Sequence, residues 1–267
     1  MGVHDLTGRN ALVTGGAQGL GAQMAAALAQ AGAGVVIADI DEEAGRATAD
    51  AIERSGARAA FVALDVTEDA GWESAVAVTI AELGGFDLLV NNAGVEITEL
   101  LTDISQDRVR AMLDINLLGP ALGIKHAFRA MRPGGPAGTG GTIVNISSVA
   151  ATIAFPGIAM YSATKSGVDR LTRVAAMESG KLGYGVRVNC VYPGLVGNRM
   201  GLALANDVVE LGLFPDTDEA VGAVVGQTPL GRLATGEEIA AAVVFLASDA
   251  AGFITGAGLP VDGGMGM

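Results

Sequence analysis

A short apolar segment that runs through a glycine-rich loop into a helix constrains this chain more than any other feature. Asn10–Thr14 (NALVT) has the length and residue types of a buried strand, and the helical run AQMAAALAQAG ends at Gly32. Between them lies Gly15-Gly16-Ala17-Gln18-Gly19-Leu20-Gly21. Glycines at such a turn let backbone N–H groups approach a pyrophosphate, and the helix N-terminus adds its positive dipole end. The segment predicts the first strand and phosphate-binding loop of an α/β fold.

Strand and helix patterns alternate along the rest of the chain. Strands are predicted at 35–38, 59–64, 87–90, 142–146, 186–191 and 258–264, the last one including a turn. Helices are predicted at 42–55, 69–83, 105–131, 161–182 and 236–248. This alternation is typical of a doubly wound parallel sheet with helices on both faces. Because no boundary or repeat divides the sequence, we predict a single domain over residues 1–267.

Composition argues against several other classes of protein. With 16 Lys and Arg against 29 Asp and Glu, the net charge is −13, which disfavours binding to nucleic acid or an anionic membrane. One cysteine, Cys190, and two histidines supply too few ligands for a disulfide or a multi-histidine metal site, so no metal is predicted. The start, MGVHDLTGRN, lacks the apolar core of a signal peptide. We therefore predict a cytoplasmic protein.

An acidic residue closes the second predicted strand. Asp39 lies about 20 residues beyond the glycine loop, where a carboxylate accepts hydrogen bonds from both hydroxyls of an adenosine ribose. The same carboxylate repels a 2′-phosphate, and no Lys or Arg occurs between Asn10 and Asp39 to bind one. This favours NAD over NADP. The alternative is that Asp39 only caps the helix that starts near Asp41.

Tyr161 and Lys165 form the candidate proton-transfer site. A spacing of four residues places both side chains on one face of a helix. A phenol with a pKa of about 10 is a poor base at neutral pH, and a neighbouring cation lowers that pKa. Two serines, Ser147 and Ser148, follow the fifth strand and offer a hydroxyl for a substrate oxygen. The spacing alone also fits an ordinary amphipathic helix. The glycine loop, Asn91-Asn92-Ala93-Gly94, the serines and Pro193-Gly194 all follow strand ends, however, and so converge on one sheet edge.

Two further segments carry expectations. Pro120 inside the predicted helix 105–131 predicts a kink near Asn116, which is either a polar surface residue or part of the site. Residues 195–227 are apolar and follow a strand end. We interpret them as a mobile helical lid over an apolar pocket, with packing or an oligomer contact as the alternative.

With these segments in order, the chain resembles the short-chain dehydrogenase/reductase family from end to end. The motifs that carry the resemblance are TGGAQGLG (14–21), Asp65-Val66, NNAG (91–94), Asn116, IVNISS (143–148), YSATK (161–165), RVNCVYPG (187–194) and VDGG (261–264). The resemblance implies a Rossmann-type seven-stranded sheet of order 3-2-1-4-5-6-7. It also implies hydride transfer between a nicotinamide cofactor and an alcohol or ketone, and a homotetramer.

The same resemblance implies roles for individual residues. Tyr161 is the general acid/base, Lys165 lowers its pKa and binds the nicotinamide ribose, Ser148 orients the substrate oxygen, and Asn116 holds a water that links Lys165 to solvent. Ser147 is the structural neighbour of Ser148. The residues expected to bind the cofactor are Gly15, Gln18, Gly19, Leu20, Gly21, Asp39, Ile40, Asp65, Val66, Asn92, Ala93, Gly94, Tyr161, Lys165, Pro193, Gly194, Val196 and Asn198.

The sequence departs from the family pattern in four places. Asn198 stands where the family often has Thr, and Val149-Ala150-Ala151 replaces a frequent glycine and should narrow the pocket wall. The loop at 133–140 is longer than usual. Glu96, just beyond NNAG, either faces the substrate mouth or is a solvated loop carboxylate, and we favour the solvated interpretation.

The apolar residues Ile153, Phe155, Ile158 and Leu195, with Arg199 as the sole basic neighbour, favour a hydrophobic secondary alcohol or ketone. The chain is similar to bacterial hydroxysteroid dehydrogenases in its DVT and TPLGR segments, so a bulky cyclic or steroid-like substrate is expected. The alternative within the family is a 3-oxoacyl thioester reductase acting on a carrier-bound or CoA substrate. Outside it, a methyltransferase or a non-catalytic NAD-binding module would use a similar glycine loop, but neither explains Ser148, Tyr161 and Lys165 together.

Overall fold

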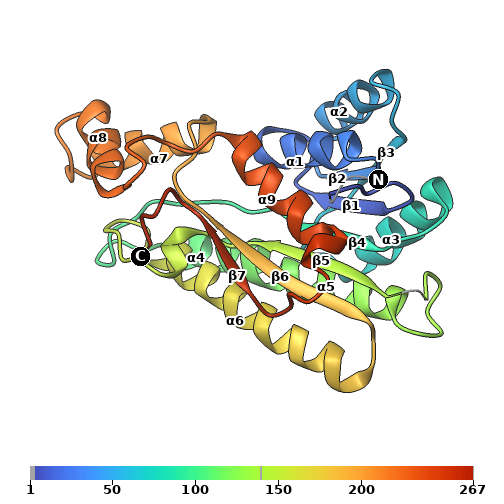
Figure 1. The fold of residues 1–267 in the computed structure, drawn as a ribbon. Coiled ribbons are helices and arrows are strands. Elements are labelled where there is room, and N and C mark those ends of the chain that lie inside the picture. The colour runs from blue at the N-terminus through green and yellow to red at the C-terminus, as the bar shows by residue number, and fades with distance from the viewer. Residues whose placement is uncertain (1–3, 139, 267) are drawn as a thin grey trace.

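The computed structural model of the chain describes residues 4–138 and 140–266. Residues 1–3, Thr139 of the predicted long loop and Met267 lie outside the described residues. Seven strands in the described part form one parallel sheet with the order β3-β2-β1-β4-β5-β6-β7 (Figure 1). The predicted sheet, its parallel pairing and its strand order are therefore confirmed.

The strands and helices follow the predicted alternation, with ends that differ by a few residues. The strands are β1 (Asn10–Thr14), β2 (Gly34–Asp39), β3 (Ala59–Ala63), β4 (Leu88–Asn91), β5 (Gly141–Ile146), β6 (Val186–Pro193) and β7 (Gly258–Val261). The helices are α1 (Gly19–Gln30), α2 (Glu42–Arg54), α3 (Asp69–Leu83), α4 (Gln106–Leu113), α5 (Gly119–Met131), α6 (Ala159–Leu182), α7 (Arg199–Glu210), α8 (Thr217–Gln227) and α9 (Gly236–Ala247).

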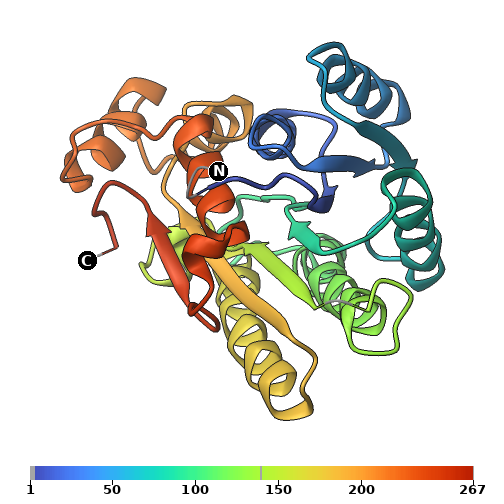
Figure 2. The same cartoon turned by 45° about the vertical axis from the view of Figure 1, so that its right-hand side comes forward.

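Successive strand residues enter two different cores, because side chains alternate across a sheet. On β1, Ala11 and Val13 pack with α1 and α9, whereas Leu12 packs with α3, α5 and α6 on the other face. Figure 2 shows these two helix layers on either side of the sheet. Burial on both faces explains why the strands are nearly continuous apolar runs, which is the pattern from which they were predicted.

The parallel register brings the carboxyl ends of the strands to one edge. Thr14 of β1 pairs with Ala38 of β2, and Asn91 of β4 pairs with Asn145 of β5. The segments that leave these strands are the glycine loop, Asp39, the NNAG segment and the two serines. The loop at 133–140 precedes β5 and lies at the opposite edge. The predicted convergence of the site segments is therefore a property of the sheet.

The segment predicted as one helix at 105–131 is interrupted. Between α4 and α5, Asp114–Leu118 forms a π-helical turn, and Pro120 lies in the first turn of α5. A π-helical turn thus lies where a kink near Asn116 was predicted, and the kink itself stays a prediction. Asn116 is fully buried there, so the interpretation of this residue as a polar surface group is wrong.

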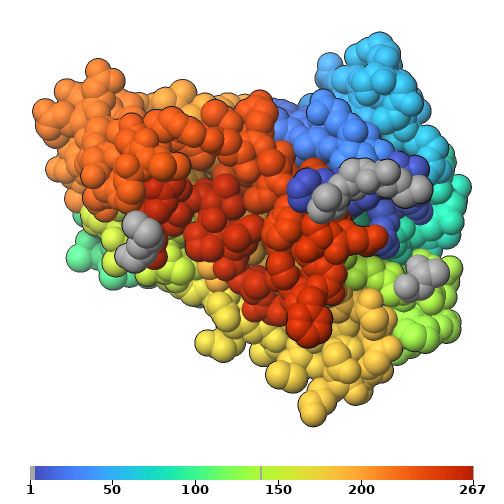
Figure 3. Space-filling model, viewed as in Figure 1, coloured from blue at the N-terminus to red at the C-terminus, as the bar shows by residue number. Residues whose placement is uncertain are grey.

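The predicted lid segment at 195–227 contains two helices. α7 and α8 pack on each other through a small apolar cluster that includes Ala205, Val208 and Ala220. In Figure 1 they lie beyond the carboxyl edge, and Figure 3 shows the chain from α8 to β7 as one continuous surface on this face of the molecule. In the residues that the structure describes, no helix combines the length and apolar character needed to cross a membrane.

Candidate active site

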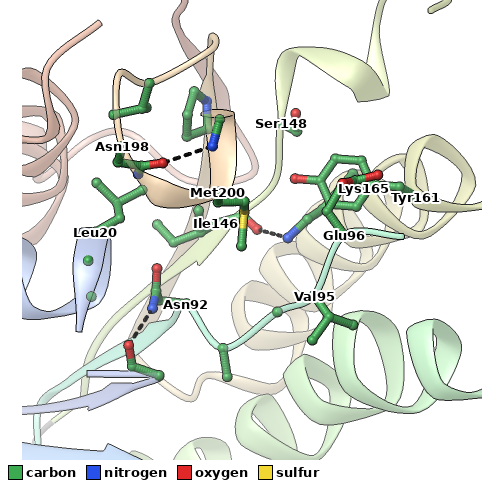
Figure 4. Close-up of a pocket in the computed structure, with 18 of the residues that line it drawn as sticks. Leu20, Asn92, Val95, Glu96, Ile146, Ser148, Tyr161, Lys165, Asn198 and Met200 are labelled. Atoms are coloured by element: carbon green, nitrogen blue, oxygen red, sulfur yellow. Dashed lines mark hydrogen bonds between the residues drawn. The ribbon is translucent and has the colours of Figure 1, made fainter. Parts of the chain in front are cut away.

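A cavity of about 600 Å³ opens at the carboxyl edge of the sheet. It is lined by all of the residues that the sequence predicted for the cofactor, together with Ser148 (Figure 4). Asn116 is the one predicted site residue that does not line it. Figure 4 shows Leu20 and Asn198 on one side and Glu96, Tyr161 and Lys165 on the other. The cavity therefore joins the predicted cofactor residues to the predicted proton-transfer residues.

The glycine loop lies against the end of β4 so closely that side chains are excluded. A Cβ on Gly21 would collide with the Gly15 carbonyl oxygen and lie 2.6 Å from Nδ2 of Asn92. Gly15 and Gly19 have φ of 62° and 54°, which L side chains rarely adopt. The loop ends at the N-terminus of α1, where no side chain caps the backbone N–H groups. This cradle fits the pyrophosphate of a dinucleotide.

Replacing Gly21 by Ala is expected to weaken NADH binding at least tenfold, because the packed loop must move to admit the methyl group (about 1.4 kcal/mol per factor of ten). Titration of NADH fluorescence measures the change. Gly180→Ala is the matched control, since nothing lies within 4 Å of its Cβ position in α6, and it should bind NADH like the wild type. Equal affinities of the two variants would contradict the role of the loop.

Asp39 lies at the end of β2 with its carboxylate fixed by the backbone. Its Oδ2 accepts a hydrogen bond from the Ala17 N–H at 3.0 Å, and its Oδ1 accepts one from the Asp41 N–H at 3.1 Å. The N-cap of α2 is Asp41, whose side chain accepts from the Ala44 N–H at 3.1 Å. The capping role considered for Asp39 therefore belongs to Asp41, and Asp39 is left to line the cavity.

The end of β4 is tied to the glycine loop by an amide side chain. Nδ2 of Asn92 donates to the carbonyl oxygens of Thr14 and Gly15 at 2.9 and 3.0 Å. At Gly94, a Cβ would lie 3.2 Å from Oδ1 of Asn116 and 3.5 Å from Nζ of Lys165. Small residues in this segment thus keep the middle of the cavity open. Asp65 and Val66, which follow β3, complete its far wall.

The two serines after β5 have different surroundings. Ser147 is buried, and its hydroxyl donates to the Lys165 carbonyl oxygen at 2.8 Å. The Ser148 hydroxyl accepts from the Ala150 N–H at 3.1 Å and is close enough to Tyr161 to lower the pKa of its phenol. Both serines line the cavity, but the Ser147 hydroxyl is held by the Lys165 carbonyl oxygen, so Ser148 remains the predicted substrate-binding serine. Val149 and Ala150, which replace the frequent glycine, also line it.

Burial has the largest effect on the pKa of Tyr161. Burial raises this pKa to about 12, the nearby Ser148 hydroxyl lowers it, and the Glu96 charge raises it further. Lys165 lies with Nζ 5.6 Å from the centre of the Tyr161 ring, and its Nζ donates to the Ile146 carbonyl oxygen at 2.9 Å. Burial also lowers the pKa of Lys165 to about 8. Loss of water therefore dominates the pKa of Tyr161 in these surroundings, and the lowering by Lys165 stays a prediction.

Asn116 supports this region from behind. Its Oδ1 accepts from the Val95 N–H, and its Nδ2 donates to the Val95 carbonyl oxygen, both at 2.8 Å. Nδ2 also lies 3.2 Å from the Thr164 hydroxyl on α6. Asn116 therefore links the NNAG segment to the helix that carries Tyr161 and Lys165.

Glu96 corrects another interpretation. We favoured a solvated loop carboxylate, but Glu96 lines the cavity and is only partly exposed. Burial raises its pKa to about 7, against a hydrogen bond from Thr98 that lowers it, and the charge of Asp207 adds to the rise. A carboxyl group of this kind stands beside Tyr161 in a largely apolar cavity.

Sequence reasoning missed part of the wall. Met200 and Leu204 come from α7, Val224 from α8, and Met265 from beyond β7. The apolar character of the segment at 195–227 indicated the helical contributions, but no local pattern indicated Met265. In the part of the chain that the structure describes, no group of three or more His, Cys, Asp or Glu residues is placed to hold a metal ion.

Comparison with known proteins agrees with this geometry. Residues 15–266 match the family model described as enoyl-(acyl carrier protein) reductase. The chain is 41% identical to trans-4-hydroxycyclohexanecarboxylate dehydrogenase of Sinomonas cyclohexanicum over 260 residues. This alignment covers 95% of this chain and 91% of the relative. It is 39% identical to 3-alpha-(or 20-beta)-hydroxysteroid dehydrogenase of Mycobacterium bovis, with 97% and 90% covered.

Solved structures give the same result. A putative short-chain alcohol dehydrogenase from Sinorhizobium meliloti superposes with a TM-score of 0.87 at 34% identity, covering 99% of this chain and 98% of the other. A gluconate 5-dehydrogenase from Burkholderia cenocepacia in complex with NADP and tartrate has a TM-score of 0.87 at 34% identity, with 98% and 97% covered. The chain belongs to the short-chain dehydrogenase/reductase family. It is thus an oxidoreductase with a nicotinamide cofactor.

Proposed function

We propose that this protein is an NAD-dependent dehydrogenase that oxidises a hydrophobic, cyclic or steroid-like secondary alcohol to the ketone, or runs the reverse reaction. The observation that carries the proposal is the position of Ser148, Tyr161 and Lys165 in the same cavity as the glycine loop and Asp39. A cofactor site alone would fit a non-catalytic NAD-binding module. The added hydroxyl, phenol and ammonium groups favour an enzyme.

The residues present fit a dinucleotide. The glycine loop would hold the pyrophosphate, Asp39 the adenosine ribose, and Lys165 the nicotinamide ribose. The cofactor, when bound, supplies the carbon that accepts or donates the hydride. Lys165 is 5% exposed, so its ammonium interacts through a medium of lower polarity than water.

The chemistry of the chain itself is proton transfer. In the oxidative direction, Ser148 holds the substrate oxygen and Tyr161 takes the hydroxyl proton while the C–H bond loses its hydride. In the reductive direction, Tyr161 returns the proton to the carbonyl oxygen. With a pKa of about 12 in these surroundings, Tyr161 is well suited to keep its proton until a charge nearby favours the phenolate.

An apolar wall supports the substrate class. Ile153, Phe155 and Ile158 come from the segment between β5 and α6, and Leu195, Leu204, Val224 and Met265 come from the C-terminal part of the chain. Arg199 is exposed at the rim. The relative from S. cyclohexanicum is named for a ring alcohol that carries a carboxylate, and a cyclopentanol dehydrogenase of a Comamonas species is 36% identical, with 95% of both chains covered. We propose a ring alcohol, with α7 and α8 as a lid over it.

A 3-oxoacyl thioester reductase is the second candidate. The matched family model is named for an acyl-carrier-protein substrate too, although an enoyl reductase acts on a C=C bond and not on a ketone. A net charge of −13 counts against docking of an acidic carrier protein. Absorbance of NADH separates the candidates when ring alcohols, steroids and a 3-oxoacyl thioester are each offered with NAD(H) and NADP(H). Turnover of the thioester alone would overturn the proposal.

We also propose that the protein forms a homotetramer. Light scattering would test this oligomeric state.

A further inference from the structure

The wall of the substrate side of the cavity holds one carboxyl group that neither the cofactor nor the reacting oxygen uses. Glu96 stands on the segment between β4 and α4 and lines a cavity whose wall is mostly apolar. Figure 4 shows its side chain on the same side of the cavity as Tyr161 and Lys165. Its charge contributes to the raised pKa of Tyr161, so the two groups are close enough to interact.

Glu96 is not neutralised by a cation. Among the described residues it forms no ion pair, whereas Glu99 on the same segment pairs with Arg108 at 3.1 Å. Its hydrogen-bond partner is Thr98, whose Oγ1 lies 3.0 and 3.2 Å from the two carboxyl oxygens. A carboxyl group held in an apolar wall without a cation is costly unless it binds something.

The hydrogen bonds around Thr98 depend on which neighbouring carboxyl group carries a proton. Its Oγ1 also lies 3.3 Å from Oδ2 of Asp207 on α7, so two carboxyl groups approach one hydroxyl. A hydroxyl has a single hydrogen and donates to only one of them. When Glu96 carries a proton, both contacts of Thr98 are hydrogen bonds, because Glu96 then donates to Thr98 and Thr98 donates to Asp207. The pKa of about 7 for Glu96 agrees with a group that exchanges this proton near neutrality.

We propose that Glu96 determines specificity by binding a second hydroxyl group of the substrate, so that the enzyme prefers ring diols to ring mono-alcohols. This inference rests on the proposed function. A hydroxyl is the group that fits both states of Glu96, because it donates to the carboxylate and also to the free oxygen of the carboxylic acid, whose own proton is donated to Thr98. An ammonium group suits only the carboxylate, and a substrate carboxylate is repelled by it.

The test is a comparison of substrates that share one ring. Values of kcat/KM are measured for cyclohexanol, the isomers of cyclohexanediol, 4-aminocyclohexanol and 4-hydroxycyclohexanecarboxylate. The value for each symmetric diol is halved, because such a diol has two equivalent hydroxyls. In the wild type, kcat/KM for at least one diol isomer is expected to exceed that for cyclohexanol by at least tenfold. The reason is that cyclohexanol, which lacks the second hydroxyl, leaves the buried carboxyl group without a partner. A preference for the amino alcohol or the carboxylate, or no diol preference, would overturn the inference.

Two substitutions of Glu96 test whether this residue causes the preference for diols. Glu96→Leu is expected to reduce the diol-to-cyclohexanol ratio at least tenfold, and Glu96→Gln, which still donates and accepts, should retain an intermediate ratio. Glu99→Gln removes the same charge from the same segment outside the cavity and should keep the wild-type ratio. Because the readout is a ratio, a partial loss of folded protein does not alter it. An unchanged ratio in Glu96→Leu would overturn the role of Glu96.

Failure of this inference is distinct from failure of the proposed function. If no alcohol is oxidised with either NAD or NADP, the proposed function fails. If cyclohexanol is oxidised and the diols are not preferred, only the role of Glu96 fails.

Discussion

Replacing Tyr161 by Phe is expected to reduce alcohol oxidation about a thousandfold while NADH binds as tightly as to the wild type. The substitution removes one oxygen atom and keeps the ring that packs near Lys165. Without that oxygen, the site loses the group that takes the proton of the substrate hydroxyl. Steady-state kinetics with the best alcohol, together with titration of NADH fluorescence, measure the two quantities.

Tyr184→Phe is the matched control for this result. Tyr184 follows α6 and packs against Phe128, with ring centroids 5.3 Å apart, away from the cavity. Its loss of one hydroxyl should leave kcat within about twofold, since surface changes away from special contacts have small effects. If Tyr161→Phe kept most of its activity, another residue would have to be the acid/base.

Replacing Asp39 by Ala is expected to raise the ratio of kcat/KM for NADP to that for NAD about a hundredfold. A charged hydrogen bond to a ribose hydroxyl contributes about 1.5–3 kcal/mol, so NAD loses at least about tenfold. Removal of the carboxylate also ends its repulsion of a 2′-phosphate, so NADP gains. Initial rates with the two cofactors at saturating alcohol measure the ratio.

Asp39→Asn separates charge from packing, because alanine also removes the acceptors of the Ala17 and Asp41 N–H groups. The amide keeps the size of the side chain and one acceptor, so its ratio should lie between those of the wild type and the alanine variant. Asp50→Ala, on the exposed side of α2, removes the same charge outside the cavity and should change nothing. A wild type that already prefers NADP would overturn the assignment of Asp39.

The residues at the carboxyl edge of the sheet were predictable because each of them belongs to a short sequence pattern. Apolar runs such as Asn10–Thr14, glycines between strand and helix, and an acid at the end of β2 each report their own surroundings. The rule that parallel strands end at one edge then assembles them without coordinates. The four-residue spacing of Tyr161 and Lys165 belongs to the same class of signal, since a helix presents both on one face.

Some features depended on residues far apart in the chain. The π-helical turn buries Asn116 and directs its amide to Val95, which the local appearance of a polar residue beside Pro120 did not reveal. The pKa of Tyr161 depends on how completely the cavity excludes water, and this depends on walls contributed by other segments. The spacing of Tyr161 and Lys165 along the chain carries no information on this burial.

By itself, the sequence determined the fold, the cofactor edge and the pair Tyr161 and Lys165, because each follows from a periodicity or a strand end. Only the tertiary structure decided the surroundings of Glu96, which the sequence suggested was solvated. The segment after β4 places Glu96 and Thr98 against Asp207 of α7, more than a hundred residues away in the chain. Burial and charge at such a contact depend on three-dimensional packing, and no spacing along the chain encodes them.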